Sequence, residues 1–391
     1  MKSVALLYNS PVLGGAERSI TSQILNLNEC KITYVIPIVD GVDQAQDLKD
    51  HILESSPNAK ITYLQYPRGL YSASRSGGVG VVSLFKMLIG MIQILMNLKR
   101  LDLGAMDVLW TNGNKIGLPV LLFSKIISYE GIFIWHFRDY PFNGGIYRHI
   151  WKQLKKSSSL KKILLANSFS VEKSIKELMA SDCNNSEIMT IYNPVGNIQR
   201  RDLGQDHDRS MVIGVASMLA PWKGIHTVLE FERMYRNELK ELGIREIAIY
   251  GGDIYSTKGE HQNYLNQLLE LSSQDSLISF KGKQQPKDIF ANIDILLHTS
   301  LRPEPFGRVI IEAFAAGIPV VSTCLGGSGE LVVNSKSGLR IHPYDHAGLY
   351  SALSDLSEKS EYMNIAKGAQ ERLVEVESQQ TQFWKELNMK I

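Results

Sequence analysis

The stretch that decides the fold is EPFGRVIIEAFAAGIPVVSTCLGGSGE, residues 304–330. Residues 308–316 repeat apolar side chains at helical spacing, and Gly317 is a typical helix end. An apolar strand-like run, 293–300, precedes this helix, and another, 318–327, follows it. A buried helix between two apolar strands is the unit from which parallel sheets are built, so the stretch predicts an α/β fold.

The same alternation of short apolar runs and helical patterns extends through the chain. A polar, turn-rich segment, 193–210, separates two sets of runs and indicates a linker. We therefore expect two doubly wound, Rossmann-like domains that face each other across a cleft, where ligands bind at the carboxyl ends of the strands. The expected boundaries are 1–200 and 201–365, with a C-terminal helix, 366–391, that packs back toward the first domain. The remaining strand-like runs are 3–10, 32–39, 61–67, 107–113, 131–137, 162–168, 211–218, 245–252 and 277–282.

Composition and charge narrow the class of protein. The 391 residues are 44% hydrophobic and 21% charged, as in ordinary globular proteins, and the three cysteines show no paired spacing. This favours a reducing compartment, and the N-terminus lacks the pattern of a signal peptide, so we expect a cytoplasmic protein. Residues 1–200 carry 22 Lys and Arg against 15 Asp and Glu, whereas the remainder carries 20 against 25. The basic half indicates either an anionic partner or simply a solvated basic face.

One apolar segment, residues 79–98, needs an explanation of its own. It contains Lys86, Gln93 and Asn97, and it leads into a strand-like run. A buried helix that feeds the sheet therefore fits better than a membrane span, and a membrane-surface helix remains the alternative.

Two carboxylates bracket the helix that begins after Gly307. The first backbone N–H groups of a helix form a site for phosphate, here at Gly307, Arg308 and Val309. Glu304 precedes that site, and Glu312 lies more than a turn beyond it. Carboxylates accept strong hydrogen bonds from hydroxyl groups, so this layout suits a nucleotide-sugar, with its sugar, diphosphate and ribose in a row. The alternative interpretation is an ordinary loop acid and an ordinary helix acid.

A second constellation favours the phosphate interpretation. Lys223 and Gly224 follow the strand-like run 211–218 and begin another helical pattern, which is a phosphate-binding arrangement. A solvated lysine in a turn is the alternative.

Several segments together resemble glycosyltransferase family 4, the retaining, nucleotide-sugar-dependent enzymes of GT-B fold. The resemblance is specific within residues 211–345 and looser in the N-terminal half. It rests on APWKG, YGGD, EPFGRVIIEAFAAGIPVVST and GGSGELV, and in the N-terminal half on LGGAERSI (13–20), WHFRD (135–139) and YNPV (192–195). It implies that the first domain binds the acceptor and the second binds the nucleotide-sugar.

The resemblance also implies roles for individual residues. Glu304 corresponds to the acid that holds the donor sugar, Lys223 to the lysine that stabilises the leaving diphosphate, and His136 to a histidine that faces the sugar. The implied donor-binding residues also include Gly14 and Gly15 in the N-terminal loop, Phe306, Gly307, Arg308 and Val309 beside the phosphates, and Glu312 at the ribose.

One position departs from the family pattern. The family usually has arginine five residues before the lysine, where this chain has Met218. Loss of one charge-assisted contact costs about 1.5–3 kcal/mol. Our hypothesis is that Arg308 or Arg302 substitutes for the missing arginine.

The resemblance implies a metal-independent reaction without cofactors, in which the acceptor attacks from the side of the leaving group. The one D-x-D sequence, residues 206–208, lies in the expected linker, and His342 and His346 are separated by Pro343. P-loop and dinucleotide-binding signatures are absent from the sequence, which disfavours an NTPase or an NAD enzyme.

The partners expected besides the donor are a glycan or lipid-linked acceptor and an anionic membrane surface, but no nucleic acid. The membrane hypothesis rests on clustered Lys, Arg, Tyr and Trp in residues 147–162. We thus expect a transferase of polysaccharide or glycoconjugate biosynthesis, peripheral at the inner membrane face. The alternatives are a non-catalytic nucleotide-sugar-binding protein, a GT-B sugar-nucleotide epimerase and a two-carboxylate glycosidase.

Overall fold

The computed structural model describes residues 1–39, 45–68, 81–141, 160–179, 186–200, 210–252, 260–272 and 276–391. It divides into unit 1, residues 1–194 with 379–391, and unit 2, residues 195–378. The roles expected for the segments 1–200, 201–365 and 366–391 remain predictions. The D-x-D sequence and most of the basic run at 147–162 lie outside the described residues.

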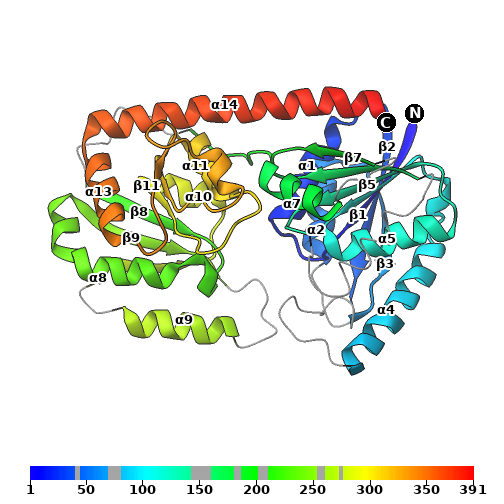
Figure 1. Cartoon of the computed structure of the whole chain (residues 1–391), viewed down its shortest axis with the longest axis horizontal. Coiled ribbons are helices and arrows are strands. Elements are labelled where there is room, and N and C mark those ends of the chain that lie inside the picture. Colours follow the sequence, from blue (N-terminus) through cyan, green and yellow to red (C-terminus); the bar gives the residue numbers. More distant parts are fainter. Residues whose placement is uncertain are drawn as a thin grey trace. The chain divides into compact units, whose positions relative to one another are not determined.

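Unit 1 is built on a seven-stranded sheet in which all neighbouring strands are parallel (Figure 1). The strand order is β3-β2-β1-β4-β5-β6-β7, so the order reverses between β1 and β4. The strands are β1 Lys2–Tyr8, β2 Cys30–Ile38, β3 Lys60–Gln65, β4 Val108–Asn112, β5 Ile132–Phe137, β6 Lys161–Ala166 and β7 Ser186–Thr190. The helices named in Figure 1 for this unit are α1 Gly15–Gln23, α2 Ala45–Ser55, α4 Val81–Lys99, α5 Asn114–Ile126 and α7 Phe169–Met179.

Apolar side chains from alternate strand positions cover both faces of this sheet. One core joins the strands to α4, α5 and α7, and the other joins them to α1, α2 and the end of α14. In the second core, Trp384 stacks on Trp110 with ring centroids 6.1 Å apart. Burial on both faces explains why the strands are nearly continuously apolar in sequence.

Unit 2 repeats the architecture with six parallel strands in the order β10-β9-β8-β11-β12-β13. The strands are β8 Met211–Ala216, β9 Ile244–Tyr250, β10 Ile278–Gly282, β11 Ile295–His298, β12 Val320–Ser322 and β13 Leu339–Arg340. The helices are α8 Ile225–Glu241, α9 Glu260–Leu271, α10 Pro286–Ala291, α11 Arg308–Ala316, α12 Ser328–Leu331, α13 His346–Ser357 and α14 Lys359–Lys390, which continues into unit 1. The predicted α/β class with two parallel-sheet domains is confirmed.

The helix that the sequence led us to expect as buried is only half buried. α4 does lead toward β4, as predicted, but Leu88, Ile92 and Met96 are 58%, 51% and 53% exposed. They are four residues apart and so lie on one face, while Ile94 and Leu98 on the opposite face enter the core. Within the described part of the chain, no helix combines the length and the apolar character that a membrane crossing requires.

Candidate functional site

The strand order of unit 2 reverses between β8 and β11, and the loops that leave these two strands meet there. A reversal of this kind is where open α/β sheets bind ligands. The loop after β8 carries Lys223, in the short 3₁₀ helix Pro221–Lys223, and the loop after β11 carries Glu304. Gly224 joins Lys223 to α8 with a φ of 71°, and a Cβ there would lie 2.2 Å from the Thr299 carbonyl oxygen. The close approach of the two loops therefore requires glycine at this position.

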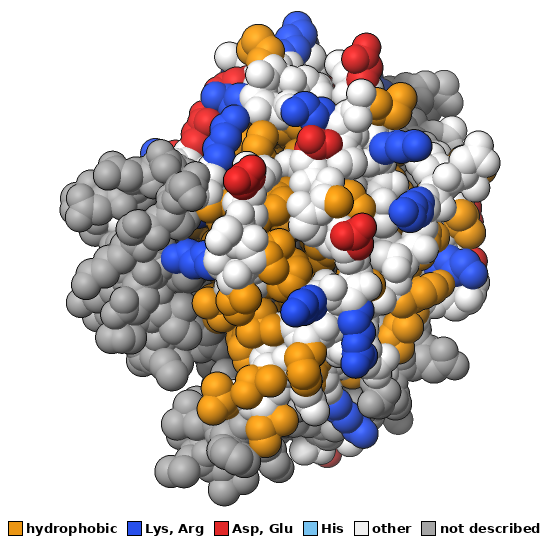
Figure 2. All heavy atoms as spheres, turned by 90° about the vertical axis from the view of Figure 1, so that its right-hand side faces the viewer, with side chains coloured by type: hydrophobic (Ala, Val, Ile, Leu, Met, Phe, Trp, Pro, Cys, Tyr) orange, Lys and Arg blue, Asp and Glu red, His pale blue; other side chains and the backbone are white. Residues whose placement is uncertain are grey.

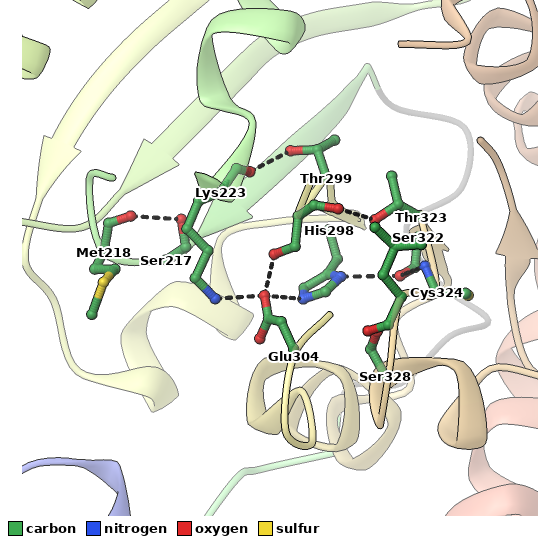
Figure 3. A network of polar contacts seen from close by, with 12 residues as sticks. Ser217, Met218, Lys223, His298, Thr299, Glu304, Ser322, Thr323, Cys324 and Ser328 are labelled. Atoms are coloured by element: carbon green, nitrogen blue, oxygen red, sulfur yellow. Dashed lines mark hydrogen bonds and ion pairs between the residues drawn. The ribbon is translucent and has the colours of Figure 1, made fainter. Parts of the chain in front are cut away.

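Three donors converge on one oxygen of Glu304 (Figure 3). The Lys223 Nζ lies 2.5 Å from Glu304 Oε1, and the His298 Nε2 lies 3.0 Å from the same atom. The Ser300 hydroxyl also donates to it. Glu304 is 6% exposed. Burial favours the neutral acid, but the contacts with His298 and Lys223 outweigh it and hold the pKa of the Glu304 carboxyl well below its usual range.

The sequence analysis did not identify His298, Ser300 or Ser322, which fix this carboxylate. His298 ends β11 and Ser322 ends β12, and the two are paired across the parallel ladder. Their side chains meet, with His298 Nδ1 3.0 Å from Ser322 Oγ. The available signal was polar residues at the carboxyl ends of two otherwise apolar strands, because neighbouring parallel strands end at the same edge of a sheet.

The second predicted acid has a different partner. Gly307 precedes α11 with a φ of 98° and no side-chain cap. One turn into the helix, Glu312 accepts a hydrogen bond from Arg308 Nη2 at 2.7 Å. Burial raises the pKa of the Glu312 carboxyl, and the Arg308 charge offsets only part of this rise. Phe306 is buried beside the helix start, while Val309 is partly exposed.

Met218, which stands where the family pattern has arginine, lies five residues before Lys223 and carries no charge. Met218 is half-buried, and its carbonyl oxygen accepts a hydrogen bond from Ser217 Oγ at 3.1 Å. The Lys223 ammonium lies 4.3 Å from the ring centroid of Trp222, a cation–π contact. Arg302 is exposed.

The N-terminal residues of the predicted site belong to unit 1. Gly14 precedes α1, which begins at Gly15. Glu17 lies three residues after Gly14, and burial raises its pKa to about 7. His136 is fully buried at the end of β5, and neither of its ring nitrogens meets a hydrogen-bond partner among the described residues. Burial, followed by the charge of Arg138, holds the pKa of His136 well below its usual range.

Arg138 is the centre of a polar network in unit 1. Its Nε donates to Asn112 Oδ1 at 2.7 Å, and its Nη1 donates to Asn193 Oδ1 at 2.6 Å. The network therefore ties the carboxyl ends of β4 and β5 to the YNPV turn. The structure thus brings Lys223 to Glu304 and Arg308 to Glu312 in unit 2, while Gly14, Gly15 and His136 are placed within unit 1. No three described His, Cys, Asp or Glu residues lie close enough to hold a metal ion.

Comparison with known proteins finds a family model that matches part of the chain. Residues 197–372 match the family model described as Glycosyl transferases group 1. This match lies entirely in unit 2 and includes Glu304, Glu312 and Lys223. The sequence-based resemblance is confirmed at this level, whereas the narrower assignment to family 4 remains a prediction.

Relatives and solved structures agree with that match. The chain is 25% identical to the sucrose synthase of Nitrosomonas europaea over 202 residues, 47% of this chain and 25% of that protein. It is 29% identical to spore coat protein SA of Bacillus subtilis over 167 residues, 41% of this chain and 43% of that protein. The aligned segments thus span less than half the length of these curated relatives.

Similarity in fold extends further than similarity in sequence. The crystal structure of HepE from Anabaena in complex with UDP-glucose superposes with a TM-score of 0.74, covering 100% of both chains at 18% identity. At this identity the similarity shows the fold alone.

Proposed function

We propose that this protein is a retaining glycosyltransferase that moves a sugar from a nucleotide-diphosphate-sugar to a glycan or lipid-linked acceptor. The observation that carries the proposal is the contact between Lys223 and Glu304 at the strand-order reversal of unit 2, beside the uncapped start of α11. A cation and a helix N-terminus together suit a diphosphate, and the two acids suit hydroxyl groups on either side of it. The match of residues 197–372 to group 1 glycosyl transferases supports the same chemistry.

The proposed mechanism follows from where charge develops. Breaking the bond between the sugar and the diphosphate leaves negative charge on the phosphate and positive charge on the anomeric carbon. Lys223 and the starts of α8 and α11 stabilise the negative charge, without a metal ion or another cofactor. Glu304 holds the sugar hydroxyls, and Glu312 holds the ribose. The acceptor attacks from the side of the leaving group, and the departing phosphate takes its proton.

The roles of the other predicted residues are part of this proposal. Phe306, Gly307, Arg308 and Val309 line the phosphates, Gly14 and Gly15 also bind the donor, and His136 orients the sugar. Arg308 donates to Glu312 through Nη2 at 2.7 Å, so compensation for Met218 by Arg308 uses the other N–H groups of its guanidinium or breaks this contact. Arg302 is exposed and forms the second candidate.

Thermal unfolding with a panel of UDP-, GDP-, ADP- and dTDP-glucose tests the donor class. We expect one nucleotide-sugar to raise the unfolding midpoint, because a ligand at one hundred times its Kd stabilises the native state by about 2.7 kcal/mol. UDP-glucose is the first candidate because HepE was solved with it. Stabilisation by none of the four glucose donors, nor by UDP, GDP, ADP or dTDP, would contradict a nucleotide-sugar site.

Met218 favours a second candidate function, a protein that binds nucleotide-sugars without transferring them. An uncharged residue in place of arginine lowers the positive charge available for the leaving diphosphate. Release of free nucleoside diphosphate in the presence of acceptor separates the two, because a binding protein releases none.

We further propose that the protein works in the cytoplasm, in peripheral contact with an anionic inner membrane surface, in the assembly of a polysaccharide or other glycoconjugate. The exposed apolar face of α4, formed by Leu88, Ile92 and Met96, is followed by exposed Lys99 and Arg100. Figure 2 shows this side of unit 1, where hydrophobic side chains gather and Lys and Arg side chains are interspersed. An apolar face flanked by cations suits an anionic bilayer.

Flotation with vesicles tests this contact. We expect vesicles rich in phosphatidylserine to carry the protein at low salt, and the triple variant Leu88→Ser, Ile92→Ser, Met96→Ser to bind at least about tenfold more weakly, because burying each side chain contributes on the order of 1 kcal/mol or more. Leu269→Ser is the control, since Leu269 is 46% exposed on α9 of unit 2. Equal flotation of the triple variant and the wild type would show that α4 is not the contact.

A further inference from the structure

We propose that His298 takes up a proton when a nucleotide-sugar draws Lys223 away from Glu304, so that this buried carboxylate keeps a cationic partner. His298 is then a positioning residue for the donor site. The inference rests on the proposed function, because it requires a diphosphate to compete for Lys223.

In the proposed donor complex, the Lys223 ammonium interacts with two anions, the Glu304 carboxylate and the diphosphate. The Lys223 Nζ lies 2.5 Å from Glu304 Oε1, and the Lys223 side chain is 13% exposed. Of the three donors to this oxygen, Lys223 alone carries a permanent charge, since Ser300 is neutral and the charge of His298 depends on its protonation. A bound diphosphate attracts the same ammonium. Removing a cation from a buried carboxylate is strongly unfavourable unless another cation replaces it.

Both ring nitrogens of His298 face a hydrogen-bond partner that suits the neutral ring as well as the protonated one. Its Nε2–H faces Glu304 Oε1 at 3.0 Å, and its Nδ1 faces Ser322 Oγ at 3.0 Å. A serine hydroxyl donates to a neutral Nδ1 and accepts from a protonated one, so the ring gains a proton without moving. The ladder pairing of His298 with Ser322 and the hydrogen bond from Cys324 N to Ser322 Oγ, 3.0 Å, keep this partner in place (Figure 3).

The charges around the imidazole favour this exchange. Glu304 comes from the loop after β11, and Lys223 comes from the loop after β8. Beyond Ser322 lies Cys324, where burial raises the pKa of the thiol and keeps it neutral near pH 7. From β13, Arg340 directs its guanidinium to the carbonyl oxygens of Val332 and Gly329. Once Lys223 turns to the diphosphate, the nearest anion that His298 contacts is Glu304, which stabilises the imidazolium.

Calorimetric titration measures how many protons the protein takes up when it binds the donor. UDP-glucose, or whichever of the GDP-, ADP- and dTDP-glucose donors the thermal panel selects, is titrated without acceptor in PIPES and in Tris buffer at pH 7.5. Buffers with different ionisation enthalpies reveal the number of protons exchanged, and a nucleotide-sugar has no phosphate group that titrates near this pH. We expect uptake of up to about one proton, because Nδ1 of His298 faces a hydroxyl that can accept a hydrogen bond from the added N–H. Binding coupled to proton uptake weakens as pH rises, so the donor Kd is expected to increase by up to about tenfold per pH unit above neutrality.

Two variants and a control make the source of the proton identifiable. His298→Gln keeps an N–H donor toward Glu304 but cannot gain a charge, and Glu304→Gln removes the charge to be neutralised. Both are expected to lose the proton uptake and the pH dependence of Kd. His346→Gln is the matched control, because His346 lies at the start of α13 of the same unit, where its Nδ1 is 3.3 Å from the sulfur of Met234. This variant is expected to keep the uptake.

The outcomes are distinct. Wild-type binding without proton uptake, or uptake that persists in both His298→Gln and Glu304→Gln, would overturn the inference and leave the proposed function standing. Failure of every donor in the panel to bind would instead remove the proposed function, and the inference with it.

Discussion

Lys223→Met is expected to lower kcat for sugar transfer by roughly 10²–10³-fold, the loss typical when one electrostatic stabiliser of a transition state is removed. Methionine preserves the length of the side chain and removes its charge. The lysine is placed for this role because its 3₁₀ helix ends at Gly224, and because it already contacts Glu304. The effect should fall mainly on kcat, since the negative charge on the leaving diphosphate is greater in the transition state than in the bound donor. Steady-state release of nucleoside diphosphate in the presence of acceptor measures it.

Two further variants serve as controls for this experiment. Lys240→Met removes an exposed charge near the end of α8 and is expected to leave kcat unchanged. Lys223→Arg retains the charge in a different geometry and is expected to retain part of the activity. A Lys223→Met enzyme with the wild-type kcat would exclude this lysine as the stabiliser. A wild-type protein that binds nucleotide-sugars but never turns them over would support the binding function that Met218 suggests.

The fold was accessible from the sequence because it depends on a pattern repeated along the chain. Buried strands in a parallel sheet are apolar on both faces, and each alternates with a helix, so even an approximate assignment of elements specifies the architecture. The helix after Gly307 was predicted to within a residue or two, because α11 runs from Arg308 to Ala316 between two glycines with positive φ. Local turn chemistry of this kind is fully encoded by neighbouring residues.

The contacts within the site were less accessible because they join residues distant in sequence. Lys223 and Glu304 were identified, but their direct contact was not predicted, since it depends on how two loops 81 residues apart approach each other. His298 was overlooked because it is the last residue of an apolar strand, where a histidine resembles any satisfied core residue. The partial exposure of α4 could not be read from its composition, because an apolar sequence does not reveal which face lacks a covering element.

Glu304→Gln is expected to lower kcat by at least as much as Lys223→Met and also to destabilise the fold, with a loss that depends on pH. Glutamine leaves the buried Lys223 charge without its anion, and breaking a buried ion pair by removing one partner typically costs about 3–5 kcal/mol. Because the pKa of Glu304 is lower in the folded protein, its stabilisation is complete above the pKa of the unfolded chain, about 4.3, and is lost as pH falls below it. The difference in unfolding midpoint between wild type and variant should therefore be large at pH 7 and shrink toward pH 3.

Thermal unfolding of the full chain between pH 7 and pH 3 tests whether the difference in unfolding midpoint shrinks as pH falls. Glu241→Gln, which alters an exposed acid of α8, is the control and should match the wild type throughout. Glu312→Gln should give the opposite trend, because burial raises the pKa of Glu312, and its contribution to stability declines as pH rises through the folded pKa. A difference between wild type and Glu304→Gln that stays constant from pH 7 to pH 3 would mean that Glu304 is not ionised in the folded protein. Lys223 and His298 would then not be its charge partners, and the electrostatic basis of the proposed donor site would have to be abandoned.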